Sequence, residues 1–269
     1  PVLGRNQQCQ SVHRVSLSSA TASGSPFLVG QTALVNVRAP DRGTLGDMRR
    51  FVRDHSLSIV TLGAFLMIWL GGQAWSGHRA YNDDQRAHHQ PTVGFGEYLT
   101  RADFGEATFE NWESEFLQMG VYVLLTAWLV QKGSAESKPP GGDPKLDADP
   151  RDHQDDPDAP WPVRRGGLAL RAYENSLSLA MLGLFALAFA GHLVTGAHAF
   201  NAEQAAHGDP GVTTLGFLFR SEFWFQSLQN WQSEFLAVGS LVVLSVHLRQ
   251  RGSPESKPVH ASHHATGAD

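Results

Sequence analysis

Cysteine is almost missing from this chain. Its 269 residues include only one, Cys9, so neither an intrachain disulfide nor a cluster of thiolate metal ligands can form. The sequence also lacks a glycine-rich phosphate loop, a His-Glu-x-x-His zinc pair, a Gly-x-Ser-x-Gly elbow and a dinucleotide-binding fingerprint. Sequence motifs therefore give no support to an enzymatic activity, and they predict no cofactor and no metal site.

Charged residues are missing from four long stretches. The first contains none in 19 residues, which at about 1.5 Å per residue crosses the hydrocarbon core of a bilayer, about 30 Å. These stretches lack the polar face, repeating every 3.6 residues, that a soluble helical bundle would show. The sequence therefore predicts an all-α integral membrane protein with four transmembrane helices, at Leu57–Trp75, Phe116–Val130 extended back to Trp112, Leu177–Val194, and Phe235–Leu248 extended back to Trp231.

The chain contains an internal duplication. The segment Asn-Trp-Glu-Ser-Glu-Phe-Leu at 111–117 returns as Asn-Trp-Gln-Ser-Glu-Phe-Leu at 230–236, a shift of 119 residues. Between the copies lies a stretch rich in Pro, Gly and Asp, which has the composition of a solvated tether. The predicted organisation is an extension, a first two-helix membrane repeat, an acidic cytoplasmic linker, a second two-helix repeat and a disordered His-containing tail, at 1–47, 48–133, 134–162, 163–252 and 253–269.

The first 47 residues are interpreted as a disordered or non-native extension. They are polar and have no sustained helical period, whereas Met48 is followed by two arginines and then by the first apolar stretch. Bacterial inner-membrane proteins often begin with a methionine, a short basic segment and an apolar helix. We therefore expect Met48 to be the natural start.

Lysine and arginine residues predict the orientation. They are frequent before the first and third apolar stretches and after the second and fourth, but scarce in the loops 76–111 and 195–230. Because cytoplasmic flanks carry the excess of these residues, both termini and the linker should be cytoplasmic and both loops outside. The two repeats are then parallel, related by a pseudo-twofold axis along the membrane normal. The net charge of -5 comes largely from the linker, so the expected partner is the bilayer of a bacterial plasma membrane and not a nucleic acid.

Three clusters of residues are shared by the copies. In the first, Asn82, Gln85 and His88 are spaced to lie on one side of a helix, and their counterparts are Asn201, Gln204 and His207. This polar face could bind a cation or relay protons through the imidazoles. The alternative is that these side chains hydrogen-bond the neighbouring backbone.

The second cluster is the repeated motif itself. Asn111, Ser114 and Glu115 can point the same way on a helix, as can Asn230, Ser233 and Glu234. The glutamates are candidate functional carboxylates, because an ionisable group at membrane depth usually faces a partner or a water-filled cavity. The alternative is that Asn and Ser satisfy amides in the first turn of a helix, Glu favours the helix dipole, and Trp112 and Trp231 are interfacial anchors.

The third cluster is the turn Gly-Ser-x-Glu-Ser-Lys-Pro, at 133–139 and again at 252–258. The glycine can end the preceding helix and the proline prevents its resumption. Helix capping does not explain the Ser-x-Glu-Ser-Lys portion. We expect it to bind a protein partner or to form a fixed contact between the two copies.

Histidines outside these clusters raise the question of haem. His192 and His247 lie in the third and fourth apolar stretches, but the predicted topology separates them by about a membrane thickness, so they could not ligate one iron. The tail contains His260, His263 and His264. A flexible polar end is the preferred interpretation of this tail over a metal-binding one.

The sequence resembles an uncharacterised bacterial family of small integral membrane proteins, known as a domain of unknown function. The resemblance covers Met48 to about Pro258 and implies a four-helix membrane protein that starts at Met48, without an activity or a substrate. It rests on five segments: Met-Arg-Arg-Phe at 48–51, Tyr-Asn-x-x-Gln at 81–85, Asn-Trp-Glu-Ser-Glu-Phe-Leu-Gln at 111–118, Trp-Pro-Val-Arg-Arg-Gly-Gly at 161–167, and Asn-Trp-Gln-Ser-Glu-Phe-Leu-Ala-Val-Gly-Ser-Leu-Val-Val-Leu-Ser at 230–245.

Three functions remain open at this point. The leading prediction is a structural or interaction role in the bacterial plasma membrane, without enzymatic activity. The alternative is a small transporter, channel or proton-coupled protein whose pathway is lined by Glu115, Glu234, His88 and His207. A membrane-bound metal or haem protein is the third.

Overall fold

A computed structural model describes residues 42–267 of the chain. All regular secondary structure in the described part is helical, without a strand, which confirms the predicted all-α class. Most of the predicted extension at 1–47 lies outside the described residues, and positions 42–47 belong to helix α1 (Arg42–Asp54).

The chain divides into two units, 1–59 and 60–269. Within the described part of the first, α1 ends where Asp54 forms ion pairs with Arg50 and Arg53 at 3.6 and 3.1 Å. These pairs are exposed, so they contribute little to stability. His55 stacks on Phe51 with ring centroids 4.3 Å apart, and α2 (Ser56–Leu66) begins immediately afterwards.

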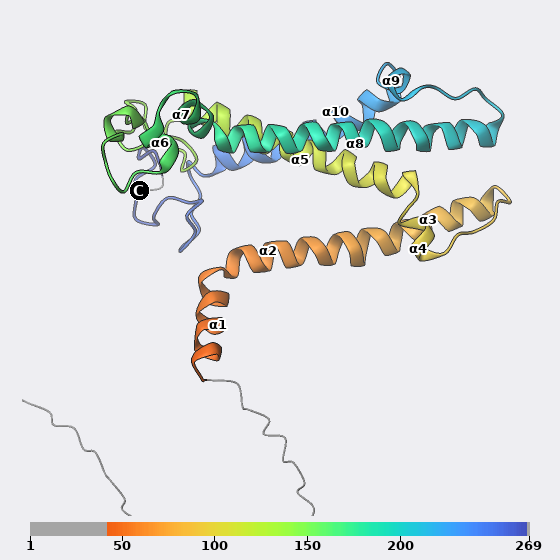
Figure 1. The fold of residues 1–269 in the computed structure, drawn as a ribbon, viewed down its shortest axis with the longest axis horizontal. Coiled ribbons are helices and arrows are strands. Elements are labelled where there is room, and N and C mark those ends of the chain that lie inside the picture. Colours follow the sequence, from red (N-terminus) through yellow and green to blue (C-terminus); the bar gives the residue numbers. More distant parts are fainter. Residues whose placement is uncertain (1–41, 268–269) are drawn as a thin grey trace, which may run out of the picture. The chain divides into compact units, whose positions relative to one another are not determined.

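The described part of the chain contains two similar series of helices, which can be followed in Figure 1. The first series runs from α2 into the π-helix η1 (Met67–Gln73), α3 (Ala74–Ala87), α4 (Phe95–Tyr98) and α5 (Ala102–Trp128). The linker contains η2 (Pro150–His153), α6 (Trp161–Arg165) and α7 (Gly167–Glu174). The second series is α8 (Ser176–His207), α9 (Thr214–Phe217) and α10 (Ser221–Leu244). Helices α9 and α10 begin 119 residues after α4 and α5.

The π-helix explains a change in the spacing between the two copies. Leu57-Ser58 corresponds to Leu177-Ser178, a shift of 120 residues, whereas Tyr81-Asn82 corresponds to Phe200-Asn201, a shift of 119. The first copy therefore has one extra residue between these points. A π-turn takes up one residue more than an α-turn, so η1 absorbs the insertion without breaking the helix.

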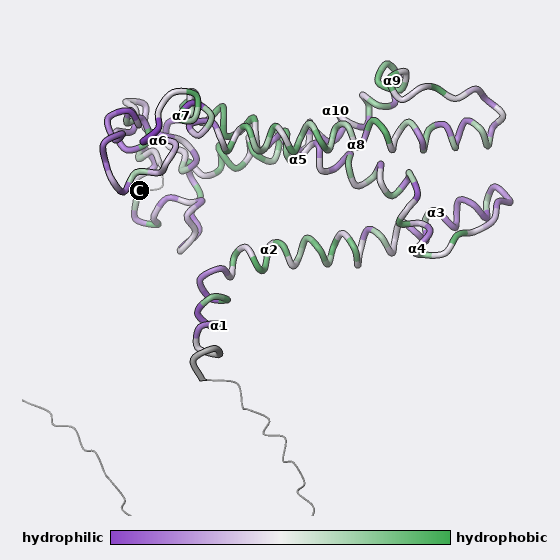
Figure 2. Tube along the Cα trace, viewed as in Figure 1, coloured by the Kyte–Doolittle hydropathy of each residue, from purple (hydrophilic) through white to green (hydrophobic). Residues whose placement is uncertain are grey.

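Two helical stretches are long and apolar enough to cross a membrane, by length and composition. They are Ser56–Ala87, which joins α2, η1 and α3, and Ser176–His207, which is α8. Figure 2 shows the apolar residues along α2 and α8, and few of them are buried within the chain. Helices α5 and α10 begin ten or more residues before the predicted second and fourth spans, and this earlier part carries Glu106 and Glu110 in α5 and Glu222 in α10.

Glycines allow α5 and α8 to pack closely. A Cβ atom at Gly191 would lie 2.7 Å from the ring of Phe109, and one at Gly105 would lie 2.7 Å from a methyl carbon of Thr195. At the far end of the contact, Gly120 faces Leu182. Small residues that let helix backbones approach are typical of helix pairs in membranes.

Aromatic side chains pack the two helices of each series against each other. In the first copy Trp69 lies 6.1 Å from Phe104 and 5.2 Å from Trp112, measured between ring centroids. In the second copy the residue corresponding to Trp69 is Phe189, which lies 5.2 Å from Phe223. The two copies therefore use equivalent aromatic positions for this packing.

Candidate functional site

An ionisable pair joins α5 and α8. Glu113 and His192 are both 0% exposed, and Oε2 of Glu113 lies 3.1 Å from Nδ1 of His192. The pair lies within the close contact of the two helices, because Gly191, beside His192, admits the ring of Phe109. The imidazole also stacks on Phe223 from α10, with ring centroids 4.7 Å apart.

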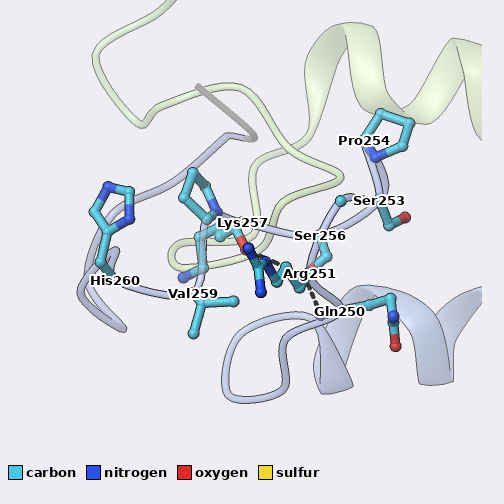
Figure 3. Close-up of a pocket in the computed structure, with 10 residues that line it drawn as sticks. Gln250, Arg251, Ser253, Pro254, Ser256, Lys257, Val259 and His260 are labelled. Carbon is cyan, nitrogen blue, oxygen red and sulfur yellow. Dashed lines mark hydrogen bonds between the residues drawn. The ribbon is translucent and has the colours of Figure 1, made fainter.

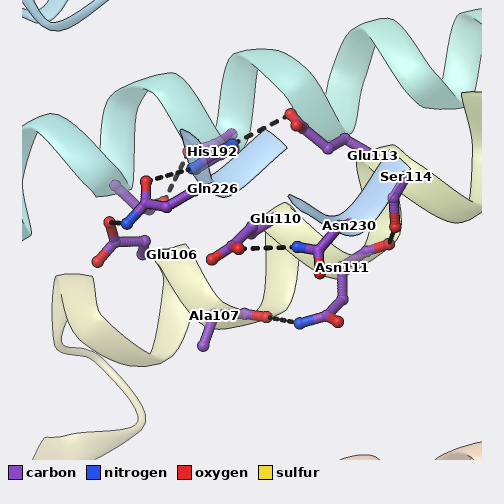
Figure 4. A network of polar contacts seen from close by, with 11 residues as sticks. Glu106, Ala107, Glu110, Asn111, Glu113, Ser114, His192, Gln226 and Asn230 are labelled. Atoms are coloured by element: carbon purple, nitrogen blue, oxygen red, sulfur yellow. Dashed lines mark hydrogen bonds and ion pairs between the residues drawn. The ribbon is translucent and has the colours of Figure 1, made fainter. Parts of the chain in front are cut away.

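The other side of the imidazole leads to α10 and back to α5 (Figure 4). Nε2 of His192 donates to Oε1 of Gln226 at 3.2 Å, and Nε2 of Gln226 donates to Oε1 of Glu106 at 3.0 Å. Nε2 of His192 therefore carries a hydrogen. A further proton between Nδ1 of His192 and Oε2 of Glu113 can be bound to either of these two atoms. Nearby, Asn230 donates to Glu110 at 2.7 Å.

We refer to Glu106, Glu110, Glu113, His192, Gln226 and Asn230 as the polar cluster. Both carboxyl oxygens of Glu113 are buried without a hydrogen-bond partner in the described part of the chain, and Oε2 forms the 3.1 Å contact with His192. The ion pair and the neutral pair differ only in the position of one proton. A second proton would give the pair a positive charge, so the pair can take up and release protons.

The shared asparagines of the first predicted cluster hold the hairpin loops. Asn82 donates to the carbonyl of Val93 at 3.0 Å and accepts from its amide at 2.8 Å. Asn201 makes the same two contacts with Val212, at 2.8 and 2.6 Å. These bonds match the predicted alternative, in which the polar face hydrogen-bonds the neighbouring backbone.

The shared glutamines and histidines lie beside these loops. The backbone carbonyls of Gln85 and Gln204 accept from residues five positions later, at 2.7 and 2.9 Å, and their side chains are half-buried. The rings of His88 and His207 lie 6.4 Å apart, edge to face. These two histidines therefore meet across the two copies, and Nδ1 of His88 also lies 3.4 Å from Asp84.

The interpretation of the repeated motif as a helix start is wrong. Helices α5 and α10 begin at Ala102 and Ser221, so the motif lies more than two turns inside each helix. The hydroxyls of Ser114 and Ser233 donate to backbone carbonyls three residues earlier, at 2.7 and 2.8 Å, and cap no amide. The preceding loop positions Arg101 and Arg220 have extended backbone and set the true start.

The asparagines of the two motifs differ in their contacts. Asn111 donates to the carbonyl of Ala107 in its own helix at 2.7 Å, whereas Asn230 donates to Glu110 of the other copy. Glu115 is exposed and Glu234 is half-buried, and the two carboxyl groups lie close enough for their charges to interact. They therefore approach each other across the two copies.

The tryptophans of the motif belong to aromatic clusters. Trp112 packs against Phe65 and Phe109, with centroids 5.9 and 5.8 Å apart. Trp231 packs against Phe185 and Trp224, at 6.2 and 6.3 Å. Their anchoring in lipid headgroups stays a prediction.

The two Gly-Ser-x-Glu-Ser-Lys-Pro turns have the same internal hydrogen bonds. In the first, Ser134 accepts from the amide of Glu136 at 3.1 Å and Ser137 accepts from the amide of Gln131 at 2.9 Å. The second turn repeats both bonds, from Glu255 to Ser253 and from Gln250 to Ser256, at 3.2 and 2.8 Å. The serines are therefore explained by the fold of the turn.

The lysine of the second turn connects the copies. Lys257 is 1% exposed, and its ammonium group donates to the carbonyl of Gly133 and, at 2.8 Å, to that of Ala265 in the tail. Burial and the charge of Arg249 lower the pKa of Lys257. The hydroxyl of Ser134 also lies 2.7 Å from that of Ser245, the residue that follows α10. These bonds form a fixed contact between the copies, and binding of a protein partner stays a prediction.

The second turn also forms an open pocket of about 620 Å³, shown in Figure 3. Arg251 and His260 line it, together with Pro254. No group of three or more His, Cys, Asp or Glu side chains is placed to hold a metal ion in the part of the chain that the structure describes.

Sequence reasoning missed most of the polar cluster because it relied on residues that both copies share. Glu113 corresponds to Gln232, and His192 corresponds to Gln73. Both members of the buried pair are therefore unique to one copy. The signal that could have found the pair is that both positions carry an ionisable residue in one copy and a glutamine in the other.

A family model described as Domain of unknown function (DUF6766) matches residues 48–268. No curated protein and no solved structure matches the chain.

Proposed function

Because the chain belongs to this family of unknown function, we propose its function from the polar cluster alone. We propose a proton-coupled integral membrane protein in which the pair Glu113 and His192 takes up and releases protons. The observation that carries the proposal is the complete burial of both groups at 3.1 Å from each other. Ionisable groups enclosed in a membrane helix pair are costly, and they usually mark a pathway for ions or protons.

The proposed membrane arrangement has four spans. The helix of Ser56–Ala87 and α8 supply two of them, and the apolar C-terminal halves of α5 and α10 supply the others. The scarcity of lysine and arginine in the loops 76–111 and 195–230 supports loops outside the cell and both termini in the cytoplasm. The resemblance to bacterial membrane proteins supports the bacterial plasma membrane.

This arrangement gives the polar cluster a direction. Glu106 and Glu110 precede Glu113 on α5, so they lie on the side of the hairpin loops, which is outside. The bonds through Gln226 then connect the buried pair to that side. Glu115, which approaches Glu234, lies beyond Glu113 toward the cytoplasm and extends the route in that direction.

Proton flux into liposomes tests the proposal. The purified chain is reconstituted with a pH-sensitive dye inside the vesicles, and a potassium diffusion potential drives the protons. We expect flux with the native chain and background flux with Glu113→Gln and with His192→Gln. Glu222→Gln removes an exposed carboxylate from the same protein and should leave the flux unchanged.

The internal duplication supplies a folding control. The double variant Glu113→Gln with His192→Gln places at this position the two residue types found at its counterpart, Gln232 and Gln73. We expect it to reconstitute normally and to lack flux. Background flux in the native chain would refute proton coupling, and native flux in Glu113→Gln with loss in Glu115→Gln would move the site to the sequence-predicted pair.

A structural or interaction role is the second candidate. The open pocket of the second turn supports it, because Arg251 and His260 present donors there to the cytoplasmic side. These donors suit the carboxylates of an acidic protein segment. Retention of a cytoplasmic protein by the native chain, with loss in Arg251→Gln and no proton flux in either, would favour this role.

A further inference from the structure

A second polar pocket lies on the first hairpin loop, away from the polar cluster. It measures about 550 Å³ and is formed by α3 and the start of α4. Its lining combines aromatic rings and cationic side chains with one amide and one carboxylate: Trp75, His78, Arg79, Asn82, Asp83, Arg86 and Phe95. We refer to it as the loop pocket.

The wall of the loop pocket is held in place. Nε2 of His78 lies 2.9 Å from the carbonyl of Val93, and the amide group of Asn82 lies 2.9 Å from the same nitrogen. The ring of Phe95 meets the imidazole edge to face, with centroids 5.6 Å apart. The loop that closes the pocket is therefore attached to α3 by side chains.

The charge in the loop pocket is positive. Arg86 pairs with Asp83 at 2.6 Å, whereas Arg79 has no carboxylate partner in the described residues and lies over the ring of Trp75, 4.2 Å from its centroid. Two guanidinium groups thus face one carboxylate. A guanidinium group binds phosphate through two parallel hydrogen bonds, which makes arginine the preferred residue for such anions.

The second copy shows that these residues are not needed for the loop to fold. Asn201 and Val212 form the same backbone contact as Asn82 and Val93. The other six pocket residues, however, have counterparts that are small or apolar except for one histidine: Val194, Ala197, His198, Ala202, Ala205 and Thr214. The loop fold is common to both copies, and the cationic aromatic pocket belongs to one.

We propose that the loop pocket binds a phosphate group carried by a lipid headgroup or by a soluble molecule. Trp75 ends the first uncharged stretch, and Arg79 follows one helical turn later. In the proposed topology this places the guanidinium group where the phosphates of the outer leaflet lie, with the indole at the interface. The rings of Trp75 and Phe95 then cover the apolar part of the ligand.

Lipid retention and phosphate titration separate the two sources. The full chain is placed in nanodiscs of phosphatidylcholine with one fifth phosphatidylglycerol, and native mass spectrometry measures the lipid that stays bound. Inorganic phosphate is titrated calorimetrically against the chain in phosphatidylcholine alone. We expect Arg79→Gln combined with Arg86→Gln to weaken the binding on the order of tenfold, equivalent to about 1.4 kcal/mol.

Two further variants keep the result interpretable. Arg220 belongs to the second loop, and its guanidinium carbon lies 5.3 Å from the centroid of the Phe200 ring. The variant Arg220→Gln should therefore leave binding to the loop pocket unchanged. Arg79→Lys preserves the charge and should retain part of the binding. Retention of phosphatidylglycerol or binding of phosphate that disappears in the double variant supports the proposal. Lipid retention that is the same in the double variant as in the native chain, without phosphate binding, or equal loss in Arg220→Gln, would overturn it.

Discussion

A single asparagine holds each hairpin loop through both hydrogen-bonding groups of one valine. Asn82 is 6% exposed, so in Asn82→Ala the amide of Val93 would lose its partner and the carbonyl would keep only the contact with His78. An unsatisfied buried polar group costs about 1–3 kcal/mol. We expect thermal unfolding to show a loss of this size for Asn82→Ala and for Asn201→Ala.

Asn175→Ala is the matched control for these two variants. Asn175 also donates to a backbone carbonyl, that of Arg171, but from an exposed position. Water replaces this bond when it is removed, so the change should stay within about 0.5 kcal/mol. Equal losses of stability in all three variants would show that the hydrogen bonds to Val93 and Val212 stabilise the protein no more than the exposed bond of Asn175 does.

The buried ammonium group of Lys257 attaches the tail to the first turn. In Lys257→Met the carbonyls of Gly133 and Ala265 lose a donor, and we expect the tail to detach. Limited proteolysis should then cut between 258 and 267 in the variant and not in the native chain. Lys132→Met removes an exposed lysine and should leave the cleavage pattern unchanged, whereas an intact tail in Lys257→Met would contradict the assigned contact.

At the scale of the helix, the contact of α8 with Phe109 of α5 depends on the missing side chain of Gly191. The Cβ of Gly191→Ala would lie 2.7 Å from the ring of Phe109, and overpacking of this kind costs about 1–3 kcal/mol. We expect the variant to be less stable by this amount and to lose proton flux, because Glu113 and His192 separate.

Gly183→Ala tests the same substitution in the same helix. A Cβ at Gly183 meets nothing within 4 Å, and alanine is favoured over glycine in a helix by about 1 kcal/mol. The stability should stay equal or rise, as measured by thermal unfolding in the same detergent. A loss at both glycines would indicate a general effect of the helix backbone and not the contact with Phe109.

The helices and their local contacts could be predicted from the sequence, whereas the site could not. Uncharged stretches and the spacing of Asn82 and Gln85 are local signals, and they predicted the helical class and the backbone contacts of the loop. The start of α5 was missed because Arg101 and Ala102 do not form a standard capping sequence. The pairing of Glu113 with His192 depends on which helices pack together, which no local pattern determines.

The whole molecule can be tested for the proposed orientation. If all four proposed spans cross, both hairpin loops lie on one side of the membrane, and the linker lies with the termini on the other. Replacing Cys9, the single native cysteine, by serine gives a background in which an introduced cysteine is the only target. Asp209→Cys places it in the second loop and Asp155→Cys places it in the linker, and both positions are exposed.

A membrane-impermeant maleimide should label Asp209→Cys in intact cells, and should label Asp155→Cys only after permeabilisation. The physical reason is that the flanks rich in lysine and arginine stay on the cytoplasmic side, while the loops with few cations cross. A cysteine at Asp83, in the first loop, should behave like the one at Asp209 if the two copies are parallel. Labelling of only one of these two loops from outside would mean that one of α5 and α8, the two long helices between these positions, does not span the membrane, because an odd number of crossings would then separate the loops.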